Sequence, residues 1–172
     1  MDLCLVGSEM CIRDSPNSLI EKNSEDPLLR FPKDFYTGAK TYLNEDEIRL
    51  IRKAYTFAHD AHQGQKRSDG TDYISHPTAV AKVLLELGMD ADSICAGFMH
   101  DVLEDCDVQK TNLEKLFNKD IANIVDGVSK LGKIDLEDKA EGNANNFQKM
   151  ALAMANDVRV IVVKLCDRLH NM

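Results

Sequence analysis

The chain has 172 residues, of which 44% are hydrophobic, so its length and composition indicate one globular domain and exclude a disordered chain. The 21 basic and 29 acidic side chains give a net charge of −8, which excludes non-specific binding of nucleic acid through a broad basic face. The five cysteines form no CxxC pair, and no apolar run is long enough to span a membrane, so we expect a reduced, cytoplasmic protein without membrane attachment.

Residues 1–40 show poor hydrophobic periodicity and contain three of the four prolines. We therefore expect them to form a loose N-terminal arm with at most short helices. Within this arm, residues 4–15 (CLVGSEMCIRDS) resemble a translated sequencing-adaptor read more than native protein. An ordinary, variable N-terminus is the alternative.

The first long helix is expected to begin after Asn44. Asn44 is followed three residues later by Glu47, which is the spacing of a capping box. Apolar residues then recur at three- and four-residue steps from Ile48 to Ala61, as they do on the buried face of a helix. Glycine, serine and aspartate residues in the segment 64–73 indicate a loop.

Two more helices are predicted in the middle of the chain. Pro77 suits a first helical turn, which would place His76 at the N-cap, and Gly88 is expected to end this helix. A third helix is expected over approximately Asp90–Asp105, where apolar residues again follow the helical period. A further capping box, Thr111 with Glu114, is expected to open a short helix.

The remainder of the chain is also predicted to be helical. Apolar residues between 121 and 128 indicate one helix, residues 132–146 are expected to form a mobile loop, and residues 147–154 are expected to be helical. The β-branched run Val158–Leu165 could be a buried strand on periodicity alone. We predict a helix because no other segment offers a partner strand.

Side chains that could bind a metal cation are concentrated at His76, in the segment His100–Asp105 and at Asp167. On one straight helix, the four polar residues of that segment would project from one side. These residues are His100, Asp101, Glu104 and Asp105. Their carboxylates would repel one another unless a cation lay among them. Mixed imidazole and carboxylate ligands suit Mn²⁺, Fe²⁺ or Zn²⁺ better than Ca²⁺.

Four ordered motifs resemble those of RelA/SpoT homologues, which belong to the HD phosphohydrolase superfamily. The motifs are residues 61–77 (AHQGQKRSDGTDYISHP), 97–105 (GFMHDVLED), 126–132 (DGVSKLG) and 163–172 (VKLCDRLHNM). The resemblance implies an all-α HD-domain helical bundle over residues 41–172. It also implies that the domain is truncated at its C-terminus, since relatives continue into further helices and then a synthetase domain.

The resemblance implies a role for particular residues of the site. It implies one divalent metal, Mn²⁺ by preference, held by His76, His100, Asp101 and Asp167. Glu104 and Asp105 correspond to the acidic pair that positions and activates water. Arg67 and Asn171 correspond to contacts of the guanine nucleotide. Lys130 could face the phosphates or be an ordinary surface charge.

Three other histidines have simpler interpretations. His59 and His62 lie close together on a predicted helix, as a metal-binding pair would, but no third ligand is evident and packing or a surface position is the favoured interpretation. His170 is expected to support the site and not to bind the metal.

The activity implied by the resemblance is metal-dependent hydrolysis of the 3′-pyrophosphate of ppGpp or pppGpp. The products would be GDP or GTP and pyrophosphate, and the reaction would control the stringent response. One alternative is an HD nucleotidase or phosphodiesterase that acts on another nucleotide. The other alternative is a non-catalytic regulatory HD domain, which loss of a ligand would indicate, and none of the four is missing.

Overall fold

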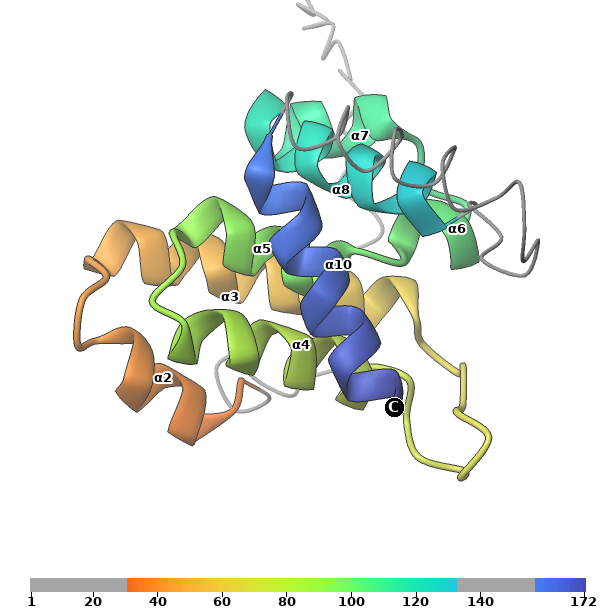
Figure 1. Ribbon diagram of the computed structural model, residues 1–172, viewed down its shortest axis with the longest axis horizontal. Helices are drawn as coiled ribbons and strands as arrows, with labels where there is room; N and C mark the ends of the chain where they lie inside the picture. The colour runs from red at the N-terminus through yellow and green to blue at the C-terminus, as the bar shows by residue number, and fades with distance from the viewer. Residues whose placement is uncertain (1–30, 133–156) are drawn as a thin grey trace, which may run out of the picture.

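The computed structural model describes residues 31–132 and 157–172, and in this part of the chain the regular elements are helices (Figure 1). The only β-structure among these residues is an isolated bridge between Lys66 and Asp72. The prediction of an all-α bundle is therefore confirmed. The helices are α2 (Lys33–Ala39), α3 (Glu45–Ala61), α4 (Ser75–Glu86), α5 (Ala91–Met99), α6 (Val102–Asp105), α7 (Lys110–Leu116), α8 (Lys119–Gly132) and α10 (Val158–Asn171).

Helix α5 lies at the centre of the bundle. All of its residues except Asp92 are buried, and α3, α4, α8 and α10 pack against it. Gly97 allows α4 to come close, because a Cβ atom at this position would lie 2.5 Å from Leu84 Cδ1. The residue that follows this buried helix is His100, so a candidate metal ligand is itself fully buried at the centre of the bundle.

Several local predictions are confirmed. Asn44 and Glu47 form the expected reciprocal capping box at the start of α3, and Gly88 has the positive φ angle of 70° that a glycine allows after a helix. The run beginning at Val158 is the helix α10 and not a strand. Buried Val160 and Val163 lie on the side of α10 that faces the core formed with α4, α5 and α8.

The prediction of one continuous helix over Asp90–Asp105 is wrong, because the chain leaves α5 at Met99 and enters the short helix α6 only at Val102. The His100 side chain offers a physical reason. Its Nδ1 atom lies 2.9 Å from the carbonyl oxygen of Gly97. In a continuous α-helix this carbonyl would accept a hydrogen bond from the backbone amide of Asp101. The polar residues of this segment therefore do not share one side of a straight helix.

Two predicted helix starts are also displaced. Helix α4 begins at Ser75, so His76 lies in its first turn and is not the N-cap. Helix α7 begins at Lys110 after Gln109, which makes no side-chain cap, and the predicted capping box at Thr111 does not form. Both N-caps lie two residues earlier than predicted, at Ile74 and Gln109, and helix ends are commonly displaced by this amount.

The prediction of a loose arm over residues 1–40 does not hold for its last part. Phe31 and Phe35 are buried in the core, and α2 packs against α4. The ring of Phe31 also lies edge-on to the Tyr55 ring, with centroids 5.5 Å apart. Phe31 precedes the N-cap Pro32 and Phe35 lies within α2, and the nearby prolines obscured this apolar pair in the sequence. Residues 1–30, the predicted loop 132–146 beyond Gly132, and the predicted helix 147–154 lie outside the described residues.

Replacing Phe35 with Ala is expected to lower the free energy of unfolding by about 3–5 kcal/mol, the usual cost of removing a buried aromatic ring. The ring centroid of Phe35 lies 5.3 Å from those of Phe31 and Phe98, so the substitution leaves a cavity in the core. Urea-induced unfolding measures the loss. Deletion of residues 1–15 is the control and should change the stability little, because this segment shows no amphipathic pattern in the sequence. An unchanged stability in Phe35→Ala would show that α2 does not pack on the core.

In residues 31–132 and 157–172, no helix combines the length and the apolar character needed to cross a membrane.

Candidate metal centre

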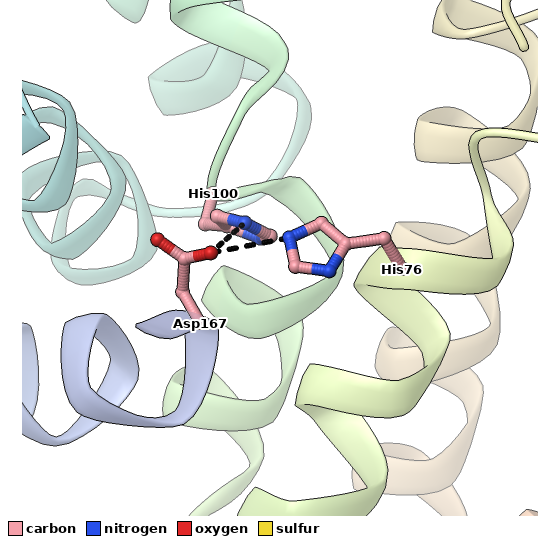
Figure 2. A group of neighbouring side chains, drawn as sticks. All are labelled: His76, His100 and Asp167. Carbon is pink, nitrogen blue, oxygen red and sulfur yellow. Dashed lines mark hydrogen bonds and ion pairs between the residues drawn. The ribbon is translucent and has the colours of Figure 1, made fainter. Parts of the chain in front are cut away.

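Three buried side chains from different helices converge on one point (Figure 2). His76 comes from the first turn of α4, His100 follows α5, and Asp167 comes from α10. One ligand atom from each residue lies within 4.8 Å of the other two. The Asp167 Oδ1 atom is 3.2 Å from His76 Nε2 and 3.7 Å from His100 Nε2. Donor atoms at this separation could share one ion at the 2.0–2.2 Å typical of transition metals.

The fourth predicted ligand, Asp101, lies at the same point. Its Oδ2 atom is 2.9 Å from His100 Nε2 and 3.8 Å from His76 Nε2. The structure therefore brings together all four residues that the sequence singled out as metal ligands. They reach this point although the helix breaks between α5 and α6.

The orientation of the His100 ring suits a metal ligand. His100 is fully buried, and its Nδ1 is placed to donate to the carbonyl of Gly97. Among the described residues, Nε2 has no hydrogen-bond partner of acceptable geometry, although it faces the Asp101 carboxylate. An imidazole with one nitrogen bound to a carbonyl and the other directed at carboxylates is the common arrangement in metal sites. The donor set thus fits a divalent transition metal.

The charges of the cluster also favour a cation. Burial lowers the pKa of His100, but contacts with Asp101 and Asp167 outweigh burial and raise this pKa to about 9. Burial opposes ionisation of both carboxylates, yet hydrogen bonds hold the pKa of each below its usual range. A buried carboxylate (Asp167) beside a partly buried one (Asp101) is costly unless a positive charge lies between them. A metal ion would supply that charge in place of an imidazole proton.

The last turn of α10 supports the cluster from a second side. His170 Nδ1 lies 2.9 Å from His76 Nδ1, and burial followed by the charge of His76 lowers the pKa of His170. Asp167 accepts hydrogen bonds from Asn171 Nδ2 at 2.7 Å and from Lys164 Nζ at 2.8 Å. These contacts orient two ligands, since a ring or carboxylate with a bound partner has fewer available rotamers.

The predicted acidic pair lies on α6, next to the cluster. Glu104 and Asp105 are both exposed, so they are accessible to a substrate. The Tyr73 hydroxyl lies 2.8 Å from Asp105 Oδ2 and 2.8 Å from Asp101 Oδ2. Burial and then the charge of Asp101 raise the pKa of Tyr73, so the phenol keeps its proton. Tyr73 was not among the residues predicted from the sequence, where its only signal is its place three residues before His76 in the first motif.

The predicted substrate contacts are divided between two places. Arg67 Nη2 donates to Asn171 Oδ1 at 3.2 Å, although the two residues are 104 positions apart. Asn171 in turn bonds a candidate ligand, so this pair lies beside the cluster. Lys130 instead donates to Asp126 Oδ2 at 2.8 Å, and among the described residues no hydrogen bond or ion pair joins it to the cluster.

His62 has a packing role, which was the favoured interpretation. It is buried, its Nδ1 lies 2.8 Å from Gln65 Oε1, and its ring stacks on Tyr73 with centroids 4.4 Å apart. His59 contacts Asp60 at 3.3 Å and is not joined to His62 by any contact in the part of the chain that the structure describes.

Residues 54–172 match the family model described as HD domain. The chain is 50% identical over 133 residues to the bifunctional (p)ppGpp synthase/hydrolase SpoT of Escherichia coli (strain K12). The aligned region covers 77% of this chain and 19% of that relative. It is 52% identical over 166 residues to the probable guanosine-3′,5′-bis(diphosphate) 3′-pyrophosphohydrolase of Synechocystis, and this alignment covers 94% of the chain and 21% of the relative. The chain thus spans about a fifth of the length of these curated relatives.

Two further comparisons agree with these. The chain is 44% identical over 134 residues to the GTP pyrophosphokinase of Myxococcus xanthus, covering 76% of the chain and 18% of the relative. The fold resembles a solved structure described as a metazoan ortholog of SpoT that hydrolyses ppGpp. The TM-score is 0.55 at 25% identity, covering 76% of this chain and 70% of that one.

Proposed function

Because the chain belongs to the HD domain family and matches a segment of RelA/SpoT-type relatives, we propose that it hydrolyses the 3′-pyrophosphate of ppGpp and pppGpp. Water adds to the phosphorus atom that is bound to the 3′-oxygen. The bond between this phosphorus and the 3′-oxygen breaks, and the 3′-oxygen takes up a proton. The products are GDP or GTP and pyrophosphate. Removal of these nucleotides would lower the signal that drives the stringent response.

The observation that carries the proposal is the convergence of His76, His100 and Asp167 on one point, with the Asp101 carboxylate next to both histidines. A divalent metal, Mn²⁺ by preference, would be held by His76, His100, Asp101 and Asp167. When bound, the ion lowers the pKa of a water molecule and neutralises phosphate charge. The donor types are equally compatible with Fe²⁺ and Zn²⁺, so the choice of Mn²⁺ depends on the family resemblance.

The chain's own residues supply the rest of the chemistry. Glu104 and Asp105 are exposed beside the ligands and are proposed to hold the attacking water and to accept its proton. Arg67 and Asn171 are proposed to contact the guanine nucleotide, because the hydrogen bond between them lies next to Asp167. Lys130 remains a proposed phosphate contact only if it leaves Asp126.

The activity of the whole protein is proposed from its relatives. Their names include synthase/hydrolase and GTP pyrophosphokinase, which supports the proposal that a C-terminal synthetase domain accompanies this domain in the full-length protein. We also propose a cytoplasmic location and no direct binding of nucleic acid by this segment, in agreement with its net charge of −8.

Removal of the metal is expected to abolish the release of pyrophosphate from ppGpp, and added Mn²⁺ should restore it, because the ion is proposed to activate the attacking water and to neutralise phosphate charge. Chelator-stripped protein is assayed with and without Mn²⁺, against dNTPs and cyclic nucleotides as competing substrates. An unchanged rate after stripping would contradict the metal assignment. Preference for a dNTP or a cyclic nucleotide would identify the chain as a different HD phosphohydrolase.

A further inference from the structure

The Tyr73 hydroxyl joins two carboxylates that have different proposed roles. It lies 2.8 Å from Oδ2 of the candidate ligand Asp101 and 2.8 Å from Oδ2 of the candidate proton acceptor Asp105. A phenol has one hydrogen and can donate it fully to only one acceptor at a time. The question is therefore which carboxylate depends on Tyr73.

Asp101 has other partners. Its Oδ2 atom faces His100 Nε2 at 2.9 Å, and a bound cation would engage it further. Asp105 differs, because Tyr73 is the only side chain among residues 31–132 and 157–172 that hydrogen-bonds its carboxylate. Asp105 is exposed on a helix of four residues, so it has little packing to select one rotamer. Loss of the phenol hydroxyl would affect Asp105 more than Asp101.

Tyr73 is itself held by the loop that precedes α4. Its ring stacks on the buried His62 ring with an interplanar angle of 23°, and His62 is bonded to Gln65. Gln65 Nε2 also donates to the backbone carbonyl of Asp105 at 3.2 Å. The loop therefore contacts Asp105 at both its backbone and its carboxylate.

We propose that Tyr73 is a positioning residue, which holds the Asp105 carboxylate next to the metal ligand Asp101 in the orientation needed to accept a proton from the attacking water. The inference depends on the proposed function, since it gives Asp105 a task only if this site hydrolyses a phosphate ester. If the inference is correct, the Tyr73 hydroxyl is needed for full turnover, whereas the Tyr73 ring is needed for the packing of His62.

The test compares Tyr73→Phe, which removes only the hydroxyl, with Tyr42→Phe, which removes a hydroxyl that donates to the backbone of Met89 away from the site. Tyr73→Phe should lower kcat for ppGpp by about 10- to 100-fold, the usual loss when a partner of an active-site residue is removed. KM and the Mn²⁺ affinity, the latter measured by calorimetry without substrate, should stay close to those of the unchanged chain. Tyr42→Phe should match the unchanged chain in all three quantities.

A double-mutant cycle tests the route of the effect. If Tyr73 acts through Asp105, then Tyr73→Phe should cost little more in a chain that already carries Asp105→Asn. Additive losses would overturn the inference, as would an unchanged kcat in Tyr73→Phe. A loss of Mn²⁺ affinity as large as that of Asp101→Asn would also overturn it, because Tyr73 would then act through the ligand.

Crystal structures of the Mn²⁺-loaded chain provide a readout that does not require activity. Asp105 should occupy one rotamer in the unchanged chain and several in Tyr73→Phe. One shared rotamer in both would overturn the inference whether or not the chain hydrolyses ppGpp. Absence of pyrophosphate release by the unchanged chain with Mn²⁺ would instead count against the proposed function.

Discussion

Replacing Glu104 with Gln is expected to lower the turnover of ppGpp at saturating Mn²⁺ by about 10²–10⁴-fold, the loss that usually follows removal of a general base. Glutamine keeps the size of the side chain and most of its hydrogen bonding but lacks an oxygen basic enough to accept a proton from water. Glu104 is exposed on α6, and its side chain makes no hydrogen bond or ion pair with another side chain of the described residues, so the substitution should leave the fold intact.

The matched control for this variant is Glu86→Gln, which changes an exposed glutamate at the end of α4 and should leave turnover unchanged. Metal titration separates the two possible causes of a loss. If Glu104→Gln binds Mn²⁺ as tightly as the unchanged chain, the loss belongs to proton transfer. If it loses Mn²⁺ as severely as Asp101→Asn, Glu104 is a ligand and the proposed division of roles fails.

Replacing Asp101 with Asn is expected to weaken Mn²⁺ binding by at least about 10- to 100-fold, since even the loss of an outer partner of a ligand costs that much. The substitution removes a negative charge from a cluster in which Asp101 Oδ2 faces both candidate histidine ligands, at 2.9 Å and 3.8 Å. Its amide retains the shape of the carboxylate and an oxygen that can accept from Tyr73. Calorimetric titration of Mn²⁺ into the stripped variant measures the change without substrate.

Asp60→Asn is the control for Asp101→Asn, because it removes an equal charge at an exposed position beside His59. Both variants should show the helical circular dichroism spectrum of the unchanged chain when stripped of metal. Affinity for Mn²⁺ that is equal in Asp101→Asn and Asp60→Asn would show that Asp101 is not a ligand. Turnover of Asp101→Asn should recover in part at high Mn²⁺, whereas turnover of Glu104→Gln should not.

The sequence by itself determined the helical class and the family. Hydrophobic residues at three- and four-residue steps, and a capping box at Asn44, are properties of contiguous residues, and they predicted α3 without reference to the rest of the chain. The order of the motifs His76-Pro77, His100-Asp101 and Asp167 along the chain likewise does not depend on where each helix ends. For this reason four candidate ligands could be named before their distances were known.

Only the tertiary structure decided how these residues meet. The break after Met99 follows from the burial of His100 against Gly97, and a helical period contains no information about that competition. The link from Tyr73 to Asp105 spans 32 positions and depends on how the loop before α4 folds over α6. The burial of Phe35 depends on the aromatic pocket beside α5. Each of these features is a contact between segments far apart in the chain, and such contacts are set by packing of the whole bundle and not by local preference.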